Sequence, residues 1–241
     1  TLGALLVATH QRVELWNDPI RFYQNITRHA PGSARAWNNL GLVYANAQRY
    51  QKAESAFTRA LDLDVTDHKA WGNRGKLRGE IAGREAEALA DLNKALAIHP
   101  DHTNNRLTRA NLLTRINRRQ AALLDYNHAI RIRPGYALSY NNRGLLHLTN
   151  SDITEALSDF NQALTIEPAN GEFLANRGSA YLIAGDMGKA IADLEQARDL
   201  QPEQASLHYN LGIAHRRSGN PELAAQSFAE ACRLGMKQAC Q

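Results

Sequence analysis

A small residue returns along the chain at a nearly constant interval. Its positions are Gly41, Gly75, Ala110, Gly144, Gly178 and Gly212, and the steps between them are 34, 35, 34, 34 and 34 residues. A period between about 20 and 50 residues indicates a chain built from stacked copies of one small structural motif. The sequence therefore predicts a repeat protein.

A second series of residues keeps the same period. In each repeat an Ala is followed four residues later by an aromatic residue or Leu, and three residues after that by another Ala, as in Ala53, Phe57 and Ala60. These spacings place the three side chains on one face of a helix. Most repeats end at a Pro, which lacks a backbone donor and cannot continue the helix. We therefore expect each repeat to form two antiparallel helices that approach closely through small residues.

The composition argues against several functional classes. The 241 residues are 44% apolar, enough for a substantial core, and the net charge of +4 comes from Lys and Arg scattered among nearly as many acids. We therefore expect no nucleic-acid partner. The sequence has no Gly-rich phosphate loop, Ser-hydrolase motif or HExxH motif, so we expect neither catalysis nor a cofactor. His99 and His102 flank a turn at Pro100 without a third ligand in evidence, which favours exposed histidines over a metal site.

The repeat residues form a recognisable combination. In the first repeat they are Trp37, Leu40-Gly41, Tyr44, Ala53, Phe57 and Ala60. This combination resembles the tetratricopeptide repeat (TPR). The resemblance covers residues 34–238 and implies an all-α fold, a right-handed α-solenoid of stacked antiparallel helix pairs. It also implies that the chain binds protein partners.

The period predicts the boundaries of the repeats. We expect six repeats in one array, at residues 34–67, 68–102, 103–136, 137–170, 171–204 and 205–238, with a C-terminal end at 239–241. Residues 1–33 contain a degenerate helical repeat. In its second helix, Asp18 is the expected N-cap and Pro19 the first helical residue.

Arg and Asp occur together in the four middle repeats. Arg directly precedes the Gly or Ala of the first helix, and Asp directly precedes the aromatic residue or Leu of the second. The pairs are Arg74 and Asp91, Arg109 and Asp125, Arg143 and Asp159, and Arg177 and Asp193. The first and sixth repeats have neither residue. Because a partly buried guanidinium without its carboxylate is costly, this joint pattern predicts structural ion pairs within each repeat. The alternative is that these Arg residues bind a ligand.

An Asn occurs two residues before the repeated Gly whether or not the Arg is present. The series is Asn39, Asn73, Asn142, Asn176 and Asn210, with Thr108 in the third repeat. These residues lie about 200° around the helix from the Gly, away from its close contact. They resemble the asparagine ladder with which the TPR array of O-linked N-acetylglucosamine transferase holds peptide backbone. One carboxamide can both donate to and accept from a peptide, so the resemblance implies peptide binding. The alternative is hydrogen bonding within the array or to water.

The first helices of TPR superhelices line a concave face, so the neighbours of the ladder are expected to line a binding groove. Besides the ladder, the predicted groove residues are Asn38, Asn141, Leu145, Leu148, Leu182 and Tyr209. The ladder would hold the backbone of an extended peptide or partner segment, and the apolar neighbours would set a side-chain preference. We therefore predict a protein–protein interaction scaffold. The sequence identifies neither the partner nor the oligomeric state.

The only two cysteines, Cys232 and Cys240, lie in the tail EACRLGMKQACQ. This tail resembles the end-of-repeat segment of Sel1-like and cysteine-rich repeat proteins. The resemblance implies a disulfide that pins a short cap over the last helices, with Gly235 as the helix stop, and hence an oxidising compartment. Two reduced thiols are the alternative.

The N-terminal flank has a second resemblance. Its Trp16, Asp18, Pro31, Ala36-Trp37 and Asn39-Leu40-Gly41 resemble the segment that leads from the last membrane span into the TPR region of membrane glycosyltransferase-type proteins. The apolar run at residues 2–8 is too short to span a bilayer; it fits either a truncated helix or the end of a membrane segment upstream of residue 1. The alternative function is therefore an extracytoplasmic, substrate-presenting TPR domain of a membrane glycosyltransferase. This hypothesis favours a periplasmic or lumenal, membrane-tethered location over a cytoplasmic one.

Overall fold

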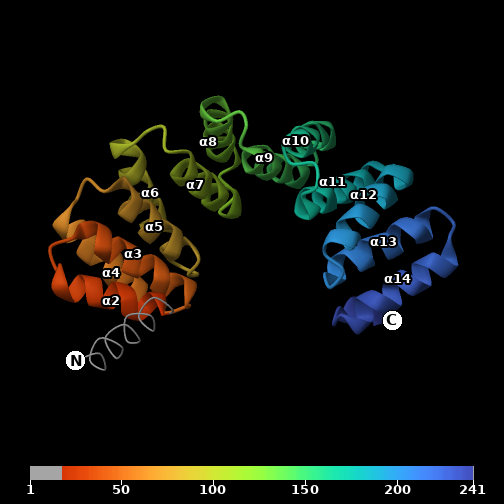
Figure 1. Ribbon diagram of the computed structural model, residues 1–241. Coiled ribbons are helices and arrows are strands. Elements are labelled where there is room, and N and C mark those ends of the chain that lie inside the picture. The colour runs from red at the N-terminus through yellow and green to blue at the C-terminus, as the bar shows by residue number, and fades with distance from the viewer. Residues whose placement is uncertain (1–17, 241) are drawn as a thin grey trace, which may run out of the picture. The chain divides into compact units, whose positions relative to one another are not determined.

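The structure, a computed structural model, describes residues 18–240, and Figure 1 shows how the helices follow one another. All regular secondary structure in these residues is helical. The first helices are α2 (Pro19–His29), α3 (Ala34–Asn46), α4 (Tyr50–Leu63), α5 (His68–Gly79), α6 (Glu85–Ile98) and α7 (Thr103–Arg115). They are followed by α8 (Arg119–Ile132), α9 (Ala137–Thr149), α10 (Ile153–Ile166), α11 (Gly171–Ala184), α12 (Met187–Leu200), α13 (Ala205–Arg217), α14 (Pro221–Arg233) and the 3₁₀ helix η1 (Lys237–Cys240). Each of the six predicted repeats contains two of the α-helices.

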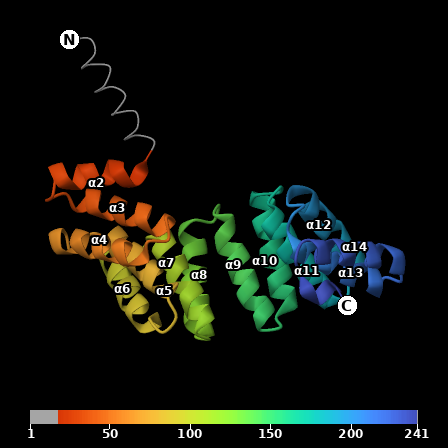
Figure 2. The same cartoon turned by 90° about the horizontal axis from the view of Figure 1, so that it is seen from below.

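The chain divides into two compact units, Thr1–Arg118 and Arg119–Gln241, which we call the N-terminal half and the C-terminal half. The division falls between α7 and α8, inside the third predicted repeat. In the N-terminal half, α2 packs on α3, the pairs α3–α4 and α5–α6 form helical hairpins, and α7 packs on α6. In the C-terminal half, α8 packs on α9, and the hairpins α9–α10, α11–α12 and α13–α14 follow. Figure 2 shows α9 and α10 side by side from below.

The start of α2 agrees with its sequence signals. Oδ1 of Asp18 accepts hydrogen bonds from the backbone N–H groups of Ile20 at 3.0 Å and Arg21 at 3.1 Å, and Pro19 is the first helical residue. The predicted cap is therefore confirmed. The remainder of the degenerate repeat's N-terminal part, including the apolar run at residues 2–8, lies outside the described residues.

The two helices of a hairpin approach most closely at the repeated Gly. A Cβ atom added at Gly144 of α9 would lie 2.8 Å from Cε1 of Phe160, and one at Gly178 of α11 would lie 2.8 Å from Cγ of Leu194. Contacts this short require a shift of the neighbouring side chain, so Gly is the residue that fits. Phe160 and Leu194 are both fully buried. The contact between a missing side chain and a large apolar one therefore determines which faces of the two helices meet.

Three of the four predicted Arg–Asp pairs are in bidentate contact. The guanidinium donates from Nε and Nη2 to the two carboxylate oxygens. The distances are 2.9 and 2.9 Å for Arg74 with Asp91, 2.8 and 2.6 Å for Arg143 with Asp159, and 2.7 and 2.7 Å for Arg177 with Asp193. The three carboxylates are buried and the three guanidinium groups are half-buried. The fourth pair, Arg109 with Asp125, would connect the two halves and stays a prediction.

Each Arg of this series has a further contact that the sequence pattern did not reveal. Its Nη1 donates to a polar side chain sixteen residues earlier, on the second helix of the preceding repeat. The contacts are Arg74 to Thr58 at 3.0 Å, Arg109 to Asn93 at 2.7 Å, Arg143 to Asn127 at 2.6 Å, and Arg177 to Asn161 at 2.8 Å. The guanidinium therefore links consecutive repeats.

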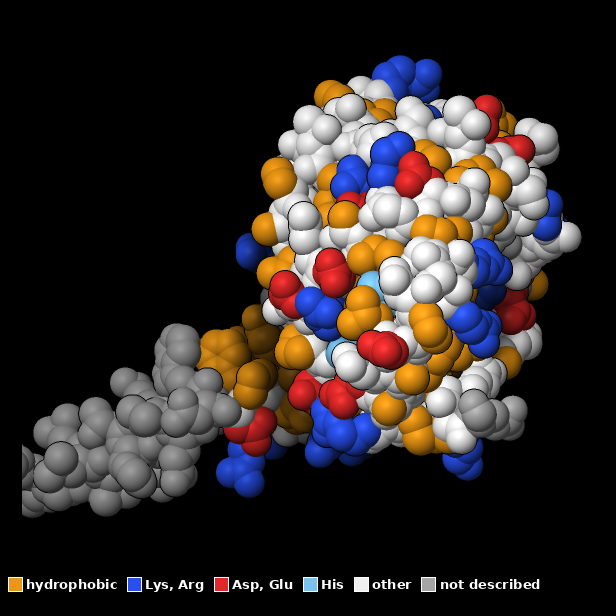
Figure 3. All heavy atoms as spheres, turned by 90° about the vertical axis from the view of Figure 1, so that its right-hand side faces the viewer, with side chains coloured by type: hydrophobic (Ala, Val, Ile, Leu, Met, Phe, Trp, Pro, Cys, Tyr) orange, Lys and Arg blue, Asp and Glu red, His pale blue; other side chains and the backbone are white. Residues whose placement is uncertain are grey.

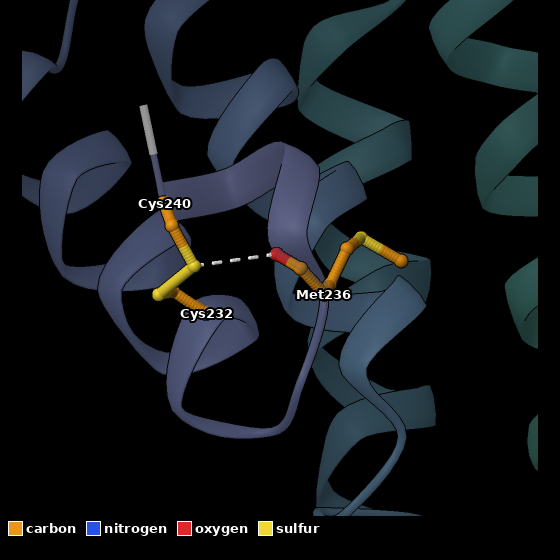
Figure 4. The surroundings of a disulfide bond; sticks show 3 residues. All are labelled: Cys232, Met236 and Cys240. Carbon is orange, nitrogen blue, oxygen red and sulfur yellow. Dashed lines mark hydrogen bonds between the residues drawn. A yellow bond between two sulfur atoms is a disulfide. The ribbon is translucent and has the colours of Figure 1, made fainter.

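A disulfide joins Cys232 of α14 to Cys240 of η1 (Figure 4). Between them, Gly235 has a φ of 97°, a left-handed conformation in which Gly commonly ends a helix. The short helix η1 packs on α14, and its Ala239 is buried. The disulfide implied by the resemblance to cysteine-rich repeats is therefore present, and it holds η1 against the end of α14.

The described helices are short compared with a bilayer. The longest have 14 residues, about 21 Å at 1.5 Å per residue, whereas the hydrocarbon core is about 30 Å thick. None of the helices within residues 18–240 is long and apolar enough to cross a membrane. The membrane segment that the alternative function would require upstream of residue 1 lies outside the described residues.

We predict that Arg143 and Asp159 stabilise the C-terminal half as a pair. Arg143→Leu leaves the buried carboxylate without its partner, so the free energy of unfolding should fall by about 3–5 kcal/mol. Adding Asp159→Ala removes the unpaired charge and should recover much of this loss, because the first repeat has Leu40 and Ala56 at the two positions. Urea denaturation of the wild type, both single variants and the double variant measures the coupling.

An exposed ion pair provides the control for this experiment. Lys189 and Asp186 are 2.8 Å apart with exposed side chains, so Lys189→Leu should leave the free energy of unfolding nearly unchanged. If the loss in the Arg143→Leu/Asp159→Ala double variant equals the sum of the two single losses, the residues do not act as a pair.

We predict that the two cysteines resist alkylation until the chain is reduced. In protein secreted into an oxidising compartment, iodoacetamide under denaturing conditions should leave the intact mass unchanged, because disulfide sulfurs carry no thiolate. Reduction before alkylation should add two carbamidomethyl groups. The Cys232→Ser/Cys240→Ser variant should gain none in either case. Labelling of the unreduced wild type would contradict the disulfide.

Candidate functional site

The predicted binding residues lie on the face formed by the first helices of the repeats. In the N-terminal half, α3 contacts α5 and α5 contacts α7, and in the C-terminal half, α9 contacts α11 and α11 contacts α13. The ladder positions on these helices are Asn39, Asn73 and Thr108 in the N-terminal half and Asn142, Asn176 and Asn210 in the C-terminal half. We call the two surfaces the N-terminal and the C-terminal first-helix face.

The ladder connects neighbouring first helices. In the N-terminal half, Nδ2 of Asn73 on α5 donates to Oδ1 of Asn38 on α3 at 2.9 Å. In the C-terminal half, Nδ2 of Asn176 on α11 donates to Oδ1 of Asn141 on α9 at 2.9 Å. Each bond crosses from one repeat to the next. Part of the hydrogen-bonding capacity of the ladder therefore holds the array together.

The same side chains keep hydrogen-bonding groups for a ligand. A carboxamide has two N–H donors and an oxygen with two lone pairs. Asn73 and Asn176 each use one N–H, and Asn210 donates one to Oγ of Ser179 at 3.2 Å. Asn39 has no hydrogen-bond partner among the described residues. All four Asn side chains are half-buried, and within the described chain their oxygens accept no hydrogen bond.

Three of the residues predicted to line the groove are buried. Asn38 is 6% exposed, Asn141 is 0% exposed and Leu182 is 6% exposed. The two Asn side chains accept the ladder bonds between first helices, and Leu182 belongs to the hydrophobic core of the C-terminal half. Their predicted exposure to a groove is wrong. Asn38 and Asn141 directly precede a ladder position and turn toward the neighbouring repeat, and Leu182 turns into the core.

The other predicted groove residues are partly accessible. Leu145 and Leu148 are half-buried and pack against the core cluster that contains Phe160. Tyr209 is half-buried, and its ring lies 5.6 Å from that of Phe228 in a T-shaped arrangement. These side chains offer apolar surface on the C-terminal first-helix face, and their role in side-chain preference stays a prediction.

The two halves differ in charge. Residues 18–118 contain 16 Lys and Arg against 10 Asp and Glu, whereas residues 119–240 contain 11 against 13. On the face drawn in Figure 3, basic and acidic side chains are interspersed among hydrophobic and neutral ones. That face therefore lacks the single-sign patch typical of nucleic-acid binding. The excess positive charge of the N-terminal half favours an acidic partner.

Three histidines meet at the ends of α5, α6 and α7. His68 is the first residue of α5, His99 follows the last residue of α6, and His102 caps α7. The ring centroids are 4.7 Å apart for His68 and His99, 4.8 Å for His68 and His102, and 5.6 Å for His99 and His102. The sequence drew attention to His99 and His102, and the fold adds His68. Within the described residues, no three His, Cys, Asp or Glu side chains are arranged to hold a metal ion.

The histidine cluster favours neutral imidazoles. Nδ1 of His102 accepts a hydrogen bond from the backbone N–H of Asn105 at 3.3 Å, so this nitrogen is unprotonated. Burial, followed by the neighbouring imidazoles, lowers the pKa of both His68 and His102. At His68, the carboxylate of Asp67 opposes the lowering of the pKa and the ammonium of Lys69 adds to it. Protonation would also remove the cap and place a positive charge at the start of α7, where the helix dipole disfavours it.

We predict that acid destabilises the chain through this cluster. An unfolded His binds a proton near pH 6.5, whereas the folded chain resists protonation because the pKa of His68 and of His102 is lowered. The contribution of these two histidines to the stability of the fold is therefore complete above about pH 7.5 and is lost as the pH drops through about 6.5. His102→Asn keeps a capping acceptor and removes one titrating group. Between about pH 7.5 and 5.5, its thermal midpoint should fall less than that of the wild type, by about 2 °C or more, as measured by circular dichroism.

An exposed histidine separates this effect from general acid sensitivity. His29 lies in the last turn of α2 and is exposed, so His29→Asn should show the pH dependence of the wild type. The same pH dependence in His102→Asn and in the wild type would contradict a role for the cluster.

The repeats match known family profiles. A family profile described as tetratricopeptide repeat matches residues 107–172, 141–198 and 175–239, and a second profile of the same description matches residues 34–67. The matches of the first profile alone cover more than half of the chain. No curated protein sequence matches the chain.

Solved structures share the fold at low sequence identity. A chain of the APC/C hetero-tetramer Cut9–Hcn1 matches with a TM-score of 0.80 and 18% identity, over 95% of this chain and 46% of that one. A tetratricopeptide repeat protein from Parabacteroides merdae matches with a TM-score of 0.73 and 20% identity, over 98% and 96% of the two chains. YrrB, described as a TPR protein with an unusual peptide-binding site, matches with a TM-score of 0.58 and 18% identity, over 82% and 97%. The present chain thus spans about half the length of the Cut9–Hcn1 chain, and at these identities the likeness shows the fold alone.

The family assignment agrees with the hairpins, the close Gly contacts and the 34-residue period. The fold is an all-α TPR solenoid, and this fold is in general a scaffold for protein interactions without catalytic activity of its own. On the extent of the profile matches, the chain belongs to the tetratricopeptide repeat family.

Proposed function

We propose that the chain binds an extended peptide, or an extended segment of a partner protein, on its first-helix faces. The observation that carries this proposal is the set of half-buried carboxamides of Asn39, Asn73, Asn176 and Asn210, whose oxygens accept no hydrogen bond from the described residues. Such oxygens are suited to accept hydrogen bonds from the backbone N–H groups of a bound peptide. Backbone recognition of this kind depends little on the side chains of the ligand.

Asn39 gives the strongest support for a role in binding. Asn73 and Asn176 each bond to the preceding repeat, so a purely structural role would explain their presence. Asn39 makes no such bond within the described chain, yet it occupies the same ladder position and is half-buried. Among the described residues no structural role is seen for Asn39, whereas ligand binding would account for all three residues.

The TPR fold supports this proposal in a general way. Proteins of this fold act as interaction scaffolds, and YrrB is described as having a peptide-binding site of its own. The alternative, a substrate-presenting domain of a membrane glycosyltransferase, depends on the flank at residues 1–33. Because residues 1–17 lie outside the described part of the chain, it remains a hypothesis from the sequence.

We predict that single ladder residues contribute to peptide affinity. Peptides are first selected from a random displayed library on the purified chain, and their affinities are then measured by isothermal titration calorimetry. Asn39→Ala should weaken binding by about fivefold to tenfold, the effect of losing about one net hydrogen bond. The thermal midpoint should stay near that of the wild type, because no described hydrogen bond of the fold is lost.

Asn46 provides a matched control on the same helix. It is the last residue of α3 and is exposed, so Asn46→Ala should leave both affinity and stability unchanged. If the selected peptides bind Asn39→Ala and Asn142→Ala as tightly as the wild type, the ladder does not hold the ligand on either first-helix face.

A further inference from the structure

The N-terminal first-helix face contains a cavity of about 160 Å³ between α5 and α7. Leu92 of α6 and Leu112 of α7 line it with apolar atoms, and Gly75 and Gly79 of α5 leave space on one side. A dry apolar cavity of roughly 150 Å³ holds a molecule the size of benzene. The cavity therefore has room for one aliphatic side chain.

Gly79 keeps this cavity open without being required by packing. A Cβ atom at Gly75 would lie 2.9 Å from Cγ of Leu92, so a side chain there would force a neighbour to move. At Gly79, an added Cβ would lie 3.7 Å from Cβ of Ala88 and 3.8 Å from Cδ1 of Leu112, which are ordinary contacts. Gly79 is the last residue of α5 and its φ is not positive, so no left-handed conformation requires Gly there. Neither packing nor backbone conformation therefore accounts for Gly at position 79.

The other repeats have a side chain at the equivalent position. Four residues after the repeated Gly or Ala they have Ala45, Thr114, Leu148, Leu182 and Arg216. The second repeat alone among the six has Gly there. The open space is therefore a property of this repeat and not of the repeat pattern.

The opening of the cavity is mainly basic. Lys76 is exposed and has no ion pair or hydrogen bond among the described residues. Arg115 donates to the backbone oxygen of Gly79, which holds its guanidinium at the cavity. Glu80 also lines the opening, so negative charge on a ligand is favoured beside Lys76 and disfavoured beside Glu80. The positive excess of the whole N-terminal half acts in the same direction.

We infer that this cavity binds an aliphatic side chain of an acidic extended peptide, with an Asp or Glu of that peptide beside Lys76. The inference rests on the proposed function, since the ladder would hold the backbone of the same peptide. The apolar lining selects the aliphatic residue, and the unpaired ammonium of Lys76 selects the neighbouring acid. Asn39 and Asn73 lie on the same N-terminal first-helix face as the cavity and would hold the peptide along it.

The test uses synthetic fluorescein-labelled peptides and fluorescence anisotropy. One set has a central Leu next to Asp or Glu, a second has Ala in place of Leu, and a third has Lys in place of the acids. The wild type should bind the first set about tenfold more tightly than the second. Gly79→Leu introduces the residue that the fourth and fifth repeats have at this position, and it should remove the preference for Leu. Lys76→Gln should weaken binding of the acidic peptides by about threefold, and less at high salt.

Two further variants serve as controls for the effect of Gly79→Leu. Gly188 is an exposed helical Gly whose added Cβ would meet only Oδ1 of Asp186, at 3.9 Å, so Gly188→Leu should leave the peptide preference unchanged. If Gly79→Leu fails to fold by its thermal melt, Gly79→Ala, which the contacts allow, should still reduce the preference for Leu. An unchanged preference for Leu in a folded Gly79 variant overturns the cavity inference.

The proposed function and the cavity inference fail in different ways. If peptides bind and Asn39→Ala weakens them, but the wild type does not distinguish Leu from Ala, the cavity inference alone is wrong. If no selected or synthetic peptide binds the wild type, both are wrong.

Discussion

The contact between the small residue of each first helix and the large apolar residue of its partner helix is the constraint on which the rest of the structure depends. A Cβ at Gly144 would collide with Phe160, so the two helices meet at a distance and rotation that a larger residue would not allow. Once this contact is set, successive positions on the helix point in known directions, about 100° apart. Arg143 then reaches the second helices, and Asn142 turns to the first-helix face. Three consecutive residues, Asn142, Arg143 and Gly144, thus provide the ladder position, the ion pair and the packing contact.

The half-buried Arg of the middle repeats shows what the sequence pattern predicts and what it misses. The joint presence of Arg and Asp predicts the ion pair, and the three pairs that lie within one half are in contact. The second partner of this Arg, on the preceding repeat, was missed, although the sequence contains a signal for it. Repeats with Arg have Thr58, Asn93, Asn127 and Asn161 sixteen residues earlier, whereas Leu40 and Leu211 are preceded at that distance by Gln24 and Glu195. A half-buried guanidinium needs acceptors for all its donors, so a search across the repeat boundary would have found this series.

Periodicity predicts the helices well because the helices repeat, but contacts between repeats depend on how the copies stack. The sequence placed the two helices of each repeat and the cap at Asp18. It did not predict that Asn73 donates to Asn38, or that Asn38 is therefore buried. It also missed that the fold brings His68 beside His99 and His102. All of these contacts join residues more than 30 positions apart, and their geometry follows from the angle between neighbouring repeats, which no local spacing encodes.

In a repeat protein, recurring residues serve the stacking or contacts that do not depend on the ligand's side chains, so side-chain specificity is expected where one copy departs from the pattern. Two departures coincide at the cavity between α5 and α7. Gly79 lacks the side chain that the other repeats have at its position, and Thr108 replaces the ladder Asn on the opposite helix. Oγ1 of Thr108 donates to the backbone oxygen of Asn104 at 2.8 Å, so this short side chain is held on its own helix and no carboxamide extends from the ladder position into the opening. Either change alone would leave the space partly filled. Because both occur at one place and neither improves packing, the second and third repeats depart from the pattern in the way that a side-chain pocket requires.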